Sequence, residues 1–173
     1  MNSFERVRAR LSGKPVDRPP NFDIMMTFAA ETIGQPLSRY YLDHRVLCEA
    51  NMAMLETFDL DIVQAISDPY REAADLGAEV EFPEYGLPVM KRPPLQSPSD
   101  LAHLTPAPDP HTSRRMSDRI AAVRWLRDNV GDEVPVMGWV EGALAEAANL
   151  RGVSTLLMDL YDNPDFVRTL LEF

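Results

Sequence analysis

The stretch that decides the fold is VPVMGWVEGALAEAANLRG, which runs from Val134 to Gly152. Its first residues are mostly apolar and too few for a helix, so they predict a buried strand. A corner bracketed by glycines follows, and then an alanine-rich helix that a glycine ends. The corner places two carboxylates, Glu141 and Glu146, near the end of the strand and the first turns of the helix. Ligands bind at such places in α/β folds, so the corner is a candidate functional site.

Upstream of this corner, strand-like and helical segments alternate. Residues 21–26 and 60–66 are expected to form two further strands, and 38–58 a long helix capped by Ser38. Residues 79–90 alternate polar and apolar side chains around a Glu-Tyr-Gly turn, which predicts a hairpin or an extended excursion. The alternation of strands and helices along the chain predicts right-handed βαβ units around a parallel sheet. The expected fold class is therefore α/β, with three core strands plus the hairpin.

Composition and charge exclude several classes of function. The chain has 173 residues, 45% of them hydrophobic, which is enough for one core. The net charge of -10, with only Lys14 and Lys91 as lysines and no basic patch, argues against a nucleic-acid or anionic-membrane partner. No stretch approaches the roughly 20 apolar residues of a membrane span. A single cysteine, Cys48, and a first segment without an apolar signal core indicate a cytoplasmic protein.

The chain is expected to form one domain over residues 1–173. A proline-rich connection at 105–111 separates segments of similar composition, so it does not indicate a domain boundary. The last segment, 164–173, stops on apolar residues without a cap, a glycine or a polar tail. The domain is therefore expected to be truncated.

Short motifs in a fixed order extend this pattern over the whole chain. They are Glu5-Arg6-Val7, GKPVDRPP at 13–20, LSRYY at 37–41, Ser67-Asp68, LGAEV at 76–80, the corner from Pro135 to Gly152, and DLYDNP at 159–164. Together they resemble the uroporphyrinogen decarboxylase superfamily. That group includes porphyrinogen decarboxylases and cobalamin-dependent methyltransferases that pass a methyl group to a thiol such as coenzyme M. The resemblance implies the amino-terminal half of a (β/α)8 TIM barrel.

The same resemblance favours the methyltransferase branch. Decarboxylases carry an Arg-Gln-Ala-Gly-Arg-Tyr signature whose arginines hold the carboxylates of the substrate, whereas residues 25–31 here contain no arginine. The decarboxylase tyrosine after the corner falls near Asn149, and only the aspartate that meets the pyrrole nitrogens is matched, by Asp68. The resemblance therefore implies corrinoid-dependent methyl transfer to a thiol. A porphyrinogen decarboxylase of tetrapyrrole biosynthesis is the alternative enzyme.

The methyltransferase branch also implies groups that this chain does not supply. A corrinoid, such as methylcobalamin, is expected as substrate or on a partner protein, and the zinc ligands of the branch are expected in a carboxyl-terminal half. His44 and Cys48, four residues apart on one predicted helix, are too few to replace that ligand set. The chain alone is thus expected to be inactive and to pair with another copy or with the missing half. A non-catalytic binding or assembly module stays open as a different class.

Asp68 and Glu141 are the candidate catalytic residues, and each also has a purely structural interpretation. Asp68 precedes a proline after a strand, so it can form an Asx-turn or a helix cap, or it can accept a hydrogen bond from a ligand. Glu141 can be a solvated loop carboxylate, or it can pair with a neighbouring arginine such as Arg151. It can also be a ligand-binding group, because the glycine beside it permits a ligand to approach closely.

Four further residues are candidates for substrate binding. Glu146 lies one turn into its helix, where a glutamate also complements the helix dipole, and Asn149 follows on the same helix. Asn21 and Asp23 alternate along the expected first strand, so one of its faces is polar. That face is either the ligand side of a barrel or part of a buried network.

Overall fold

The computed structural model describes residues 1–104 and 108–173, so the expected 105–111 connection lies partly outside the described residues. The described residues cluster into two compact units. Unit 1 is Met1–Ser67 with Asp118–Trp139, and unit 2 is Asp68–Ser117 with Val140–Phe173. The expectation of a single domain over 1–173 stays a prediction. Across the described ranges, no helix has both the length and the apolar character needed to cross a membrane.

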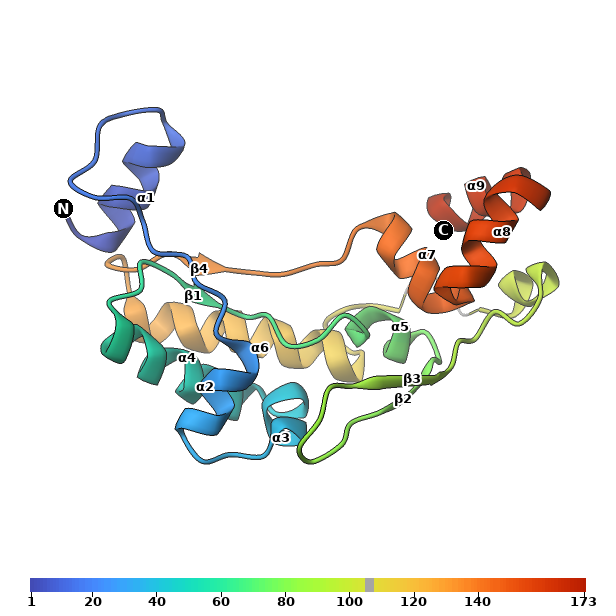
Figure 1. Cartoon of the computed structure of the whole chain (residues 1–173), viewed down its shortest axis with the longest axis horizontal. Coiled ribbons are helices and arrows are strands. Elements are labelled where there is room, and N and C mark those ends of the chain that lie inside the picture. The colour runs from blue at the N-terminus through green and yellow to red at the C-terminus, as the bar shows by residue number, and fades with distance from the viewer. Residues whose placement is uncertain (105–107) are drawn as a thin grey trace. The chain divides into compact units, whose positions relative to one another are not determined.

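Unit 1 combines helices with a short parallel pair of strands (Figure 1). Its elements are α1 (Ser3–Leu11), α2 (Met26–Thr32), α3 (Leu37–Leu42), α4 (His44–Phe58), β1 (Val63–Gln64), most of α6 (Arg114–Val130) and β4 (Val136–Met137). The strands β1 and β4 run side by side in parallel, with Val63 opposite Val136. The amide of Ala65 donates to the carbonyl of Met137 at 3.0 Å and extends the ladder. The parallel sheet expected from the order of strands and helices is thereby confirmed for the strand at 60–66 and the strand that follows Val134.

The first strand expected at 21–26 does not form. The segment contacts the β1 region through two hydrogen bonds, from Asp61 N to Asn21 O at 2.9 Å and from Gln64 Nε2 to Asp23 O at 3.2 Å. Met26 already begins α2 and has a positive φ of 32°, so the extended run is too short to build a ladder. In the described part of the chain, the parallel sheet thus has two strands and not the expected three.

The helix expected at 38–58 is divided into α3 and α4. Asp43 separates them with a φ of −130°, and its side chain accepts a hydrogen bond from the amide of Arg45 at 3.0 Å. A carboxylate at this position caps the next helix, so α4 starts at His44. The expectation that Ser38 caps the helix was wrong, because α3 begins at Leu37, directly after Pro36.

A buried carboxylate, Asp61, fastens the amino-terminal segment of unit 1. Its Oδ1 accepts hydrogen bonds from Ser3 Oγ at 2.8 Å and from Arg6 Nη1 at 2.5 Å. Its Oδ2 accepts from the amide of Asn21 at 2.7 Å and also contacts Arg18. Asn21 is thus held in place through its backbone by a carboxylate that has no exposed surface.

Unit 2 contains a hairpin and short helices. Its elements are α5 (Arg71–Asp75), β2 (Glu79–Glu81), β3 (Val89–Arg92), the 3₁₀ helix η1 (Pro98–His103), the first turn of α6, α7 (Ala143–Arg151), α8 (Val153–Asp162) and α9 (Pro164–Glu172). The strands β2 and β3 are antiparallel, with Val80 opposite Met90. The hairpin predicted at 79–90 is therefore confirmed.

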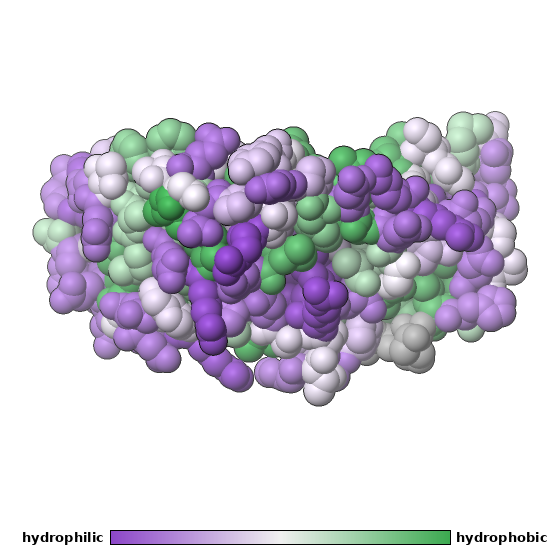
Figure 2. All heavy atoms as spheres, turned by 90° about the horizontal axis from the view of Figure 1, so that it is seen from below, coloured by the Kyte–Doolittle hydropathy of each residue, from purple (hydrophilic) through white to green (hydrophobic). Residues whose placement is uncertain are grey.

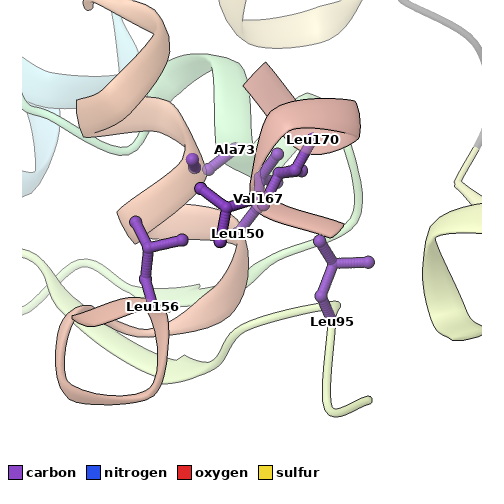
Figure 3. Close-up of a cluster of buried hydrophobic side chains, with 7 residues drawn as sticks. Ala73, Leu95, Leu150, Leu156, Val167 and Leu170 are labelled. Atoms are coloured by element: carbon purple, nitrogen blue, oxygen red, sulfur yellow. The ribbon is translucent and has the colours of Figure 1, made fainter. Parts of the chain in front are cut away.

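The core of unit 2 forms where α5, α7, α8 and α9 meet the segment around Leu95. The labelled side chains in Figure 3 point toward one another, and all of them are buried; they are Ala73, Leu95, Leu150, Leu156, Val167 and Leu170. The amide of Leu95 also donates to the carbonyl of Leu150 at 3.0 Å. Burying one leucine of this kind stabilises a fold by about 1.5–3 kcal/mol, so the cluster holds α7 firmly.

Candidate functional site

The strand, corner and helix predicted from Val134 to Gly152 are confirmed as β4 followed by α7. Gly142 is the N-cap of α7 in an extended conformation, and the half-buried Glu141 directly precedes it. The helix ends at Gly152, whose φ of 87° is one that side-chain-bearing residues rarely adopt. The two glycines therefore fix the helix ends on either side of Glu146.

The Glu146 carboxyl is the most perturbed acid of unit 2. Burial, and after it the negative charges of Glu72 and Glu141, together raise its pKa to about 7. Asn149 acts in the opposite direction, because its Nδ2 donates to Glu146 Oε1 at 3.4 Å. Two other candidates from the sequence, Glu141 and Asn149, thus act on the carboxyl group of Glu146, which is half protonated near neutral pH.

Glu72 is a member of this group that the sequence did not indicate. It lies on α5, and its Oε1 accepts a hydrogen bond from Arg71 Nη2 at 2.6 Å. Its Oε2 is buried and, within the described residues, has no hydrogen-bond partner. The same is true of Glu146 Oε2. In the sequence, only the position of Glu72, four residues after the candidate Asp68, could have indicated that it belongs to this group. Position alone does not determine which way a side chain points.

A cavity of about 350 Å³ adjoins these two carboxylates. Glu72 and Glu146 line it, and the remaining lining residues are apolar, among them Leu76, Met116 and Leu170. All of the lining residues that the structure describes belong to unit 2. The cavity therefore combines an acidic region with apolar walls, which is the usual composition of a small-molecule site.

Asp68 is engaged in a buried ion pair. Its Oδ2 accepts a hydrogen bond from Arg115 Nη2 at 2.6 Å, and its Oδ1 accepts one from the amide of Tyr70 at 3.1 Å. The guanidinium carbon of Arg115 also lies 4.7 Å from the ring centroid of Phe82. The contact with Tyr70 is the Asx-turn that the sequence allowed. The role of Asp68 in ligand binding stays a prediction.

The helix α7 is tied to the segment that follows Asp68. Asn149 Nδ2 donates to the carbonyl of Pro69 at 2.7 Å, in addition to its contact with Glu146. Four of the six candidate residues, Asp68, Glu141, Glu146 and Asn149, accordingly belong to unit 2.

The other two candidates belong to unit 1. Asp23 is exposed, and its amide donates to Asn21 Oδ1 at 3.3 Å. The side-chain amide of Asn21 donates to the carbonyl of Phe58 at 3.3 Å. Their assignment to substrate binding stays a prediction.

The residues that the structure describes contain no group of three or more His, Cys, Asp or Glu side chains that could hold a metal ion. His44 Nδ1 lies 2.8 Å from Asp118 Oδ1. Cys48 is buried, and burial raises its pKa to about 12, so its thiol is not ionised near neutral pH. A zinc ion does not fit the described part of this chain.

Comparison with solved structures defines the class of fold. The chain is similar to a methyltransferase from Methanosarcina mazei, with a TM-score of 0.86 and 21% sequence identity. The match covers 99% of this chain and 52% of that one, so this chain spans about half the length of that structure. The likeness shows the fold, which is part of a TIM barrel.

Comparison of the sequence then identifies the family. Residues 2–173 match uroporphyrinogen decarboxylase (URO-D), and the chain belongs to this family. A search of curated proteins gave no match. The family resemblance and the partial barrel predicted from the sequence are both confirmed.

Proposed function

We propose that this chain is part of an enzyme that transfers a methyl group from a corrinoid to a thiol. Family membership and the likeness in fold to a methyltransferase support this proposal. The observation that carries it is the acidic character of the cavity beside α7, where Glu72 and Glu146 have buried oxygens without a hydrogen-bond partner in the described residues. A porphyrinogen with several carboxylates would be repelled by these groups.

Unit 1 gives independent support for the same branch. The segment that corresponds to the arginine signature of the decarboxylases is Met25 with α2, and it contains no basic residue. Without such residues, the carboxylates of a porphyrinogen would lack their charged partners. Porphyrinogen decarboxylation is therefore the less favoured enzyme function.

The residues of this chain would bind and orient the reactants. The apolar walls of the cavity would exclude water, and the Glu146 carboxyl, with a pKa of about 7, can hold or release a proton near neutral pH. A corrinoid, as substrate or on a partner protein, would supply the methyl group. The described residues do not fit a zinc ion, so we assign no step to one. The proposed compartment is the cytoplasm, supported by the single buried cysteine.

Loss of methylcobalamin in the presence of a thiol, followed by its visible absorbance, tests this function. We expect the 173-residue chain alone to show no transfer, and the protein extended through the carboxyl-terminal half of the barrel to show thiol-dependent transfer. Uroporphyrinogen turnover by the extended protein, without methyl transfer, would instead identify a decarboxylase.

A non-catalytic assembly module is the second candidate, and one observation favours it. Helix α8 exposes large apolar side chains, with Leu157 61%, Met158 62% and Tyr161 89% exposed. Such a face is typical of an interaction surface. A stable homodimer without affinity for a corrinoid would support this alternative, whereas methyl transfer by the extended protein would exclude it.

A further inference from the structure

The candidate catalytic residue Asp68 has a side chain that is completely enclosed. Its exposed fraction is 0%, and Arg115 Nη2 donates to its Oδ2 at 2.6 Å. The amide of Tyr70 donates to its Oδ1 at 3.1 Å. A buried ion pair of this kind holds the chain around it in place, because separating the partners would leave an unpaired buried charge. Asp68 is therefore suited to act on the site through its neighbours, since a ligand does not reach its carboxylate directly.

The position of Arg115 is fixed at both its backbone and its side chain. Its amide donates to both carboxylate oxygens of Asp75 at 3.0 Å, which ties the start of α6 to the end of α5. The ring centroid of Phe82 lies 4.7 Å from its guanidinium carbon. The ion pair of Arg115 with Asp68 is therefore a fixed anchor for the turn that follows Asp68.

That turn presents one backbone acceptor to helix α7. The carbonyl of Pro69 accepts a hydrogen bond from Asn149 Nδ2 at 2.7 Å, and the same nitrogen donates to Glu146 Oε1 at 3.4 Å. A side-chain amide has two N–H groups, so these two acceptors use both of them. The short contact with Pro69 thus sets the direction of the second N–H, which points toward the Glu146 carboxyl.

We propose that Asp68 and Arg115 are positioning residues for the Glu146 carboxyl. They fix the turn whose carbonyl, at Pro69, directs the Asn149 amide toward that carboxyl. All of these residues belong to unit 2, and the ion pair is not among the described residues that line the cavity. The inference rests on the proposed function only in taking Glu146 as the group that holds or releases a proton.

The contacts around Glu146 give the ion pair an effect of defined direction. Burial raises the pKa of Glu146 most, and the charges of Glu72 and Glu141 add to it, whereas the Asn149 hydrogen bond and the charge of Arg71 lower it. Loss of the anchor would let the amide turn away, so the pKa should rise. Removal of the negative charge of the ion pair would, acting through space alone, lower the pKa instead.

Carbon-13 NMR titration of Glu146 in the paired variant Asp68→Ala with Arg115→Met tests the proposal. Removing both partners leaves no unpaired buried charge and keeps the net charge, so a change in the pKa of Glu146 reports position. We expect this pKa to rise by about 0.5 relative to the unmodified protein. An unchanged or lowered pKa would overturn the proposal.

Asn149→Ala interrupts the same chain of contacts at its last step. It should raise the pKa of Glu146 by the same amount as the paired variant. Combining the two should cause no further rise, because both remove the same hydrogen bond. Additive shifts would show that the ion pair acts on Glu146 by another route and would overturn the proposal. Circular dichroism checks that each variant is folded.

Two changes elsewhere in unit 2 are the controls. Asp165→Ala with Arg168→Met removes an ion pair between exposed side chains of α9. Glu79→Gln removes a negative charge from an exposed position of β2. Both should leave the pKa of Glu146 unchanged. A rise in the ion-pair control as large as in the paired variant would contradict the assignment to Asp68 and Arg115.

The unmodified protein provides a measurement that does not depend on the folding of any variant. Since the Asn149 amide donates to the Glu146 carboxyl, its side-chain nitrogen-15 resonance should change with a midpoint near pH 7. A resonance that is constant through this range would contradict the contact. None of these measurements uses a corrinoid or a thiol, so their failure leaves methyl transfer untouched. Absence of methyl transfer likewise leaves the NMR result unaffected.

Discussion

The ionisation of Glu146 depends on the fold around it. Burial is the main reason why its pKa lies near 7 and not near its ordinary value of 4.5, and the charges of Glu72 and Glu141 add to it. Between pH 4.5 and about pH 7, the Glu146 carboxyl is ionised in the unfolded chain but still protonated in the folded chain. Folding stability therefore decreases as the pH rises through this window, since the raised pKa stabilises the protonated folded form.

Replacement of the Glu146 carboxyl by an amide should remove this loss of folding stability at high pH. We expect Glu146→Gln to be more stable than the unmodified chain at pH 8 by on the order of 1 kcal/mol, a figure reduced for partial solvent exposure. The difference should vanish toward pH 4.5, where the unmodified carboxyl is protonated. Urea denaturation at both pH values measures it, and Glu79→Gln serves as control. A variant less stable than the unmodified chain at pH 8 would contradict this account.

The sequence predicted part of this group of residues and missed part. Glu141, Glu146 and Asn149 could be placed near one another, because the corner and the helix are local features of one stretch. Glu72 could not, since its approach depends on how α5 packs on the core of unit 2, which is a tertiary property. The pairing of Asp68 with Arg115, 47 residues apart, was hidden for the same reason.

The two glycines at the ends of helix α7 differ in backbone conformation. Gly152 has a φ of 87°, so alanine there would be strained, and Gly152→Ala should destabilise the protein by about 1–3 kcal/mol. Gly142 has a φ of −79° and open space around it, so Gly142→Ala should change stability by less than about 0.5 kcal/mol. Thermal unfolding of both variants compares them. Equal effects would show that backbone strain does not distinguish the two sites.

The segment before α2 depends on the buried Asp61. Its burial alone would raise its pKa, but hydrogen bonds from the Asn21 amide, Ser3, Arg18 and Arg6 lower it overall. This contribution to stability is present above the ordinary pKa of an aspartate and is lost as the pH falls through the lowered value.

Asp61→Asn should destabilise unit 1 by about 3 kcal/mol at pH 7, because Arg6 and Arg18 would lose their shared anion. Asp59→Asn is the matched control, since Asp59 pairs with Arg18 at the surface and is 87% exposed at its side chain. Its cost should stay below about 1 kcal/mol. Chemical denaturation resolves the two, and similar losses for both variants would show that burial of Asp61 is unimportant.

The sequence indicated most elements, because helical periodicity and turn residues are local signals. The strand segments around β1 and β4 and the hairpin could be located from short apolar or alternating runs bounded by breakers. Residues 21–26 do not form a strand because α2 begins at Met26, and Ser38 does not cap the helix because α3 already begins at Leu37, after Pro36. In both places the start of a helix lies elsewhere than the hydrophobic pattern and the capping residue predict.

For the whole molecule, family membership and partial coverage define what the chain can be expected to do. It spans about half the length of the methyltransferase that it resembles. Figure 2 shows green apolar residues at the surface among the purple polar ones. The large exposed hydrophobic side chains include Leu157, Met158 and Tyr161 of α8.

The chain produced alone should therefore associate with itself. We expect light scattering to give a mass above that of one chain, and Leu157→Glu with Tyr161→Glu to shift it toward the monomer. Glu81→Gln in the hairpin, an exposed position, is a control without such an effect. A monomer at all concentrations would show that this face is not an interaction surface.

The fold brings Glu72 and Glu146 together at one cavity with largely apolar walls. Carbon-13 NMR titration of the Glu146 side-chain carboxyl tests this most directly. We expect a pKa of about 7 in the unmodified protein, with a shift toward the ordinary value of 4.5 in Glu72→Gln. A pKa near 4.5 in the unmodified protein, unchanged by Glu72→Gln, would contradict it.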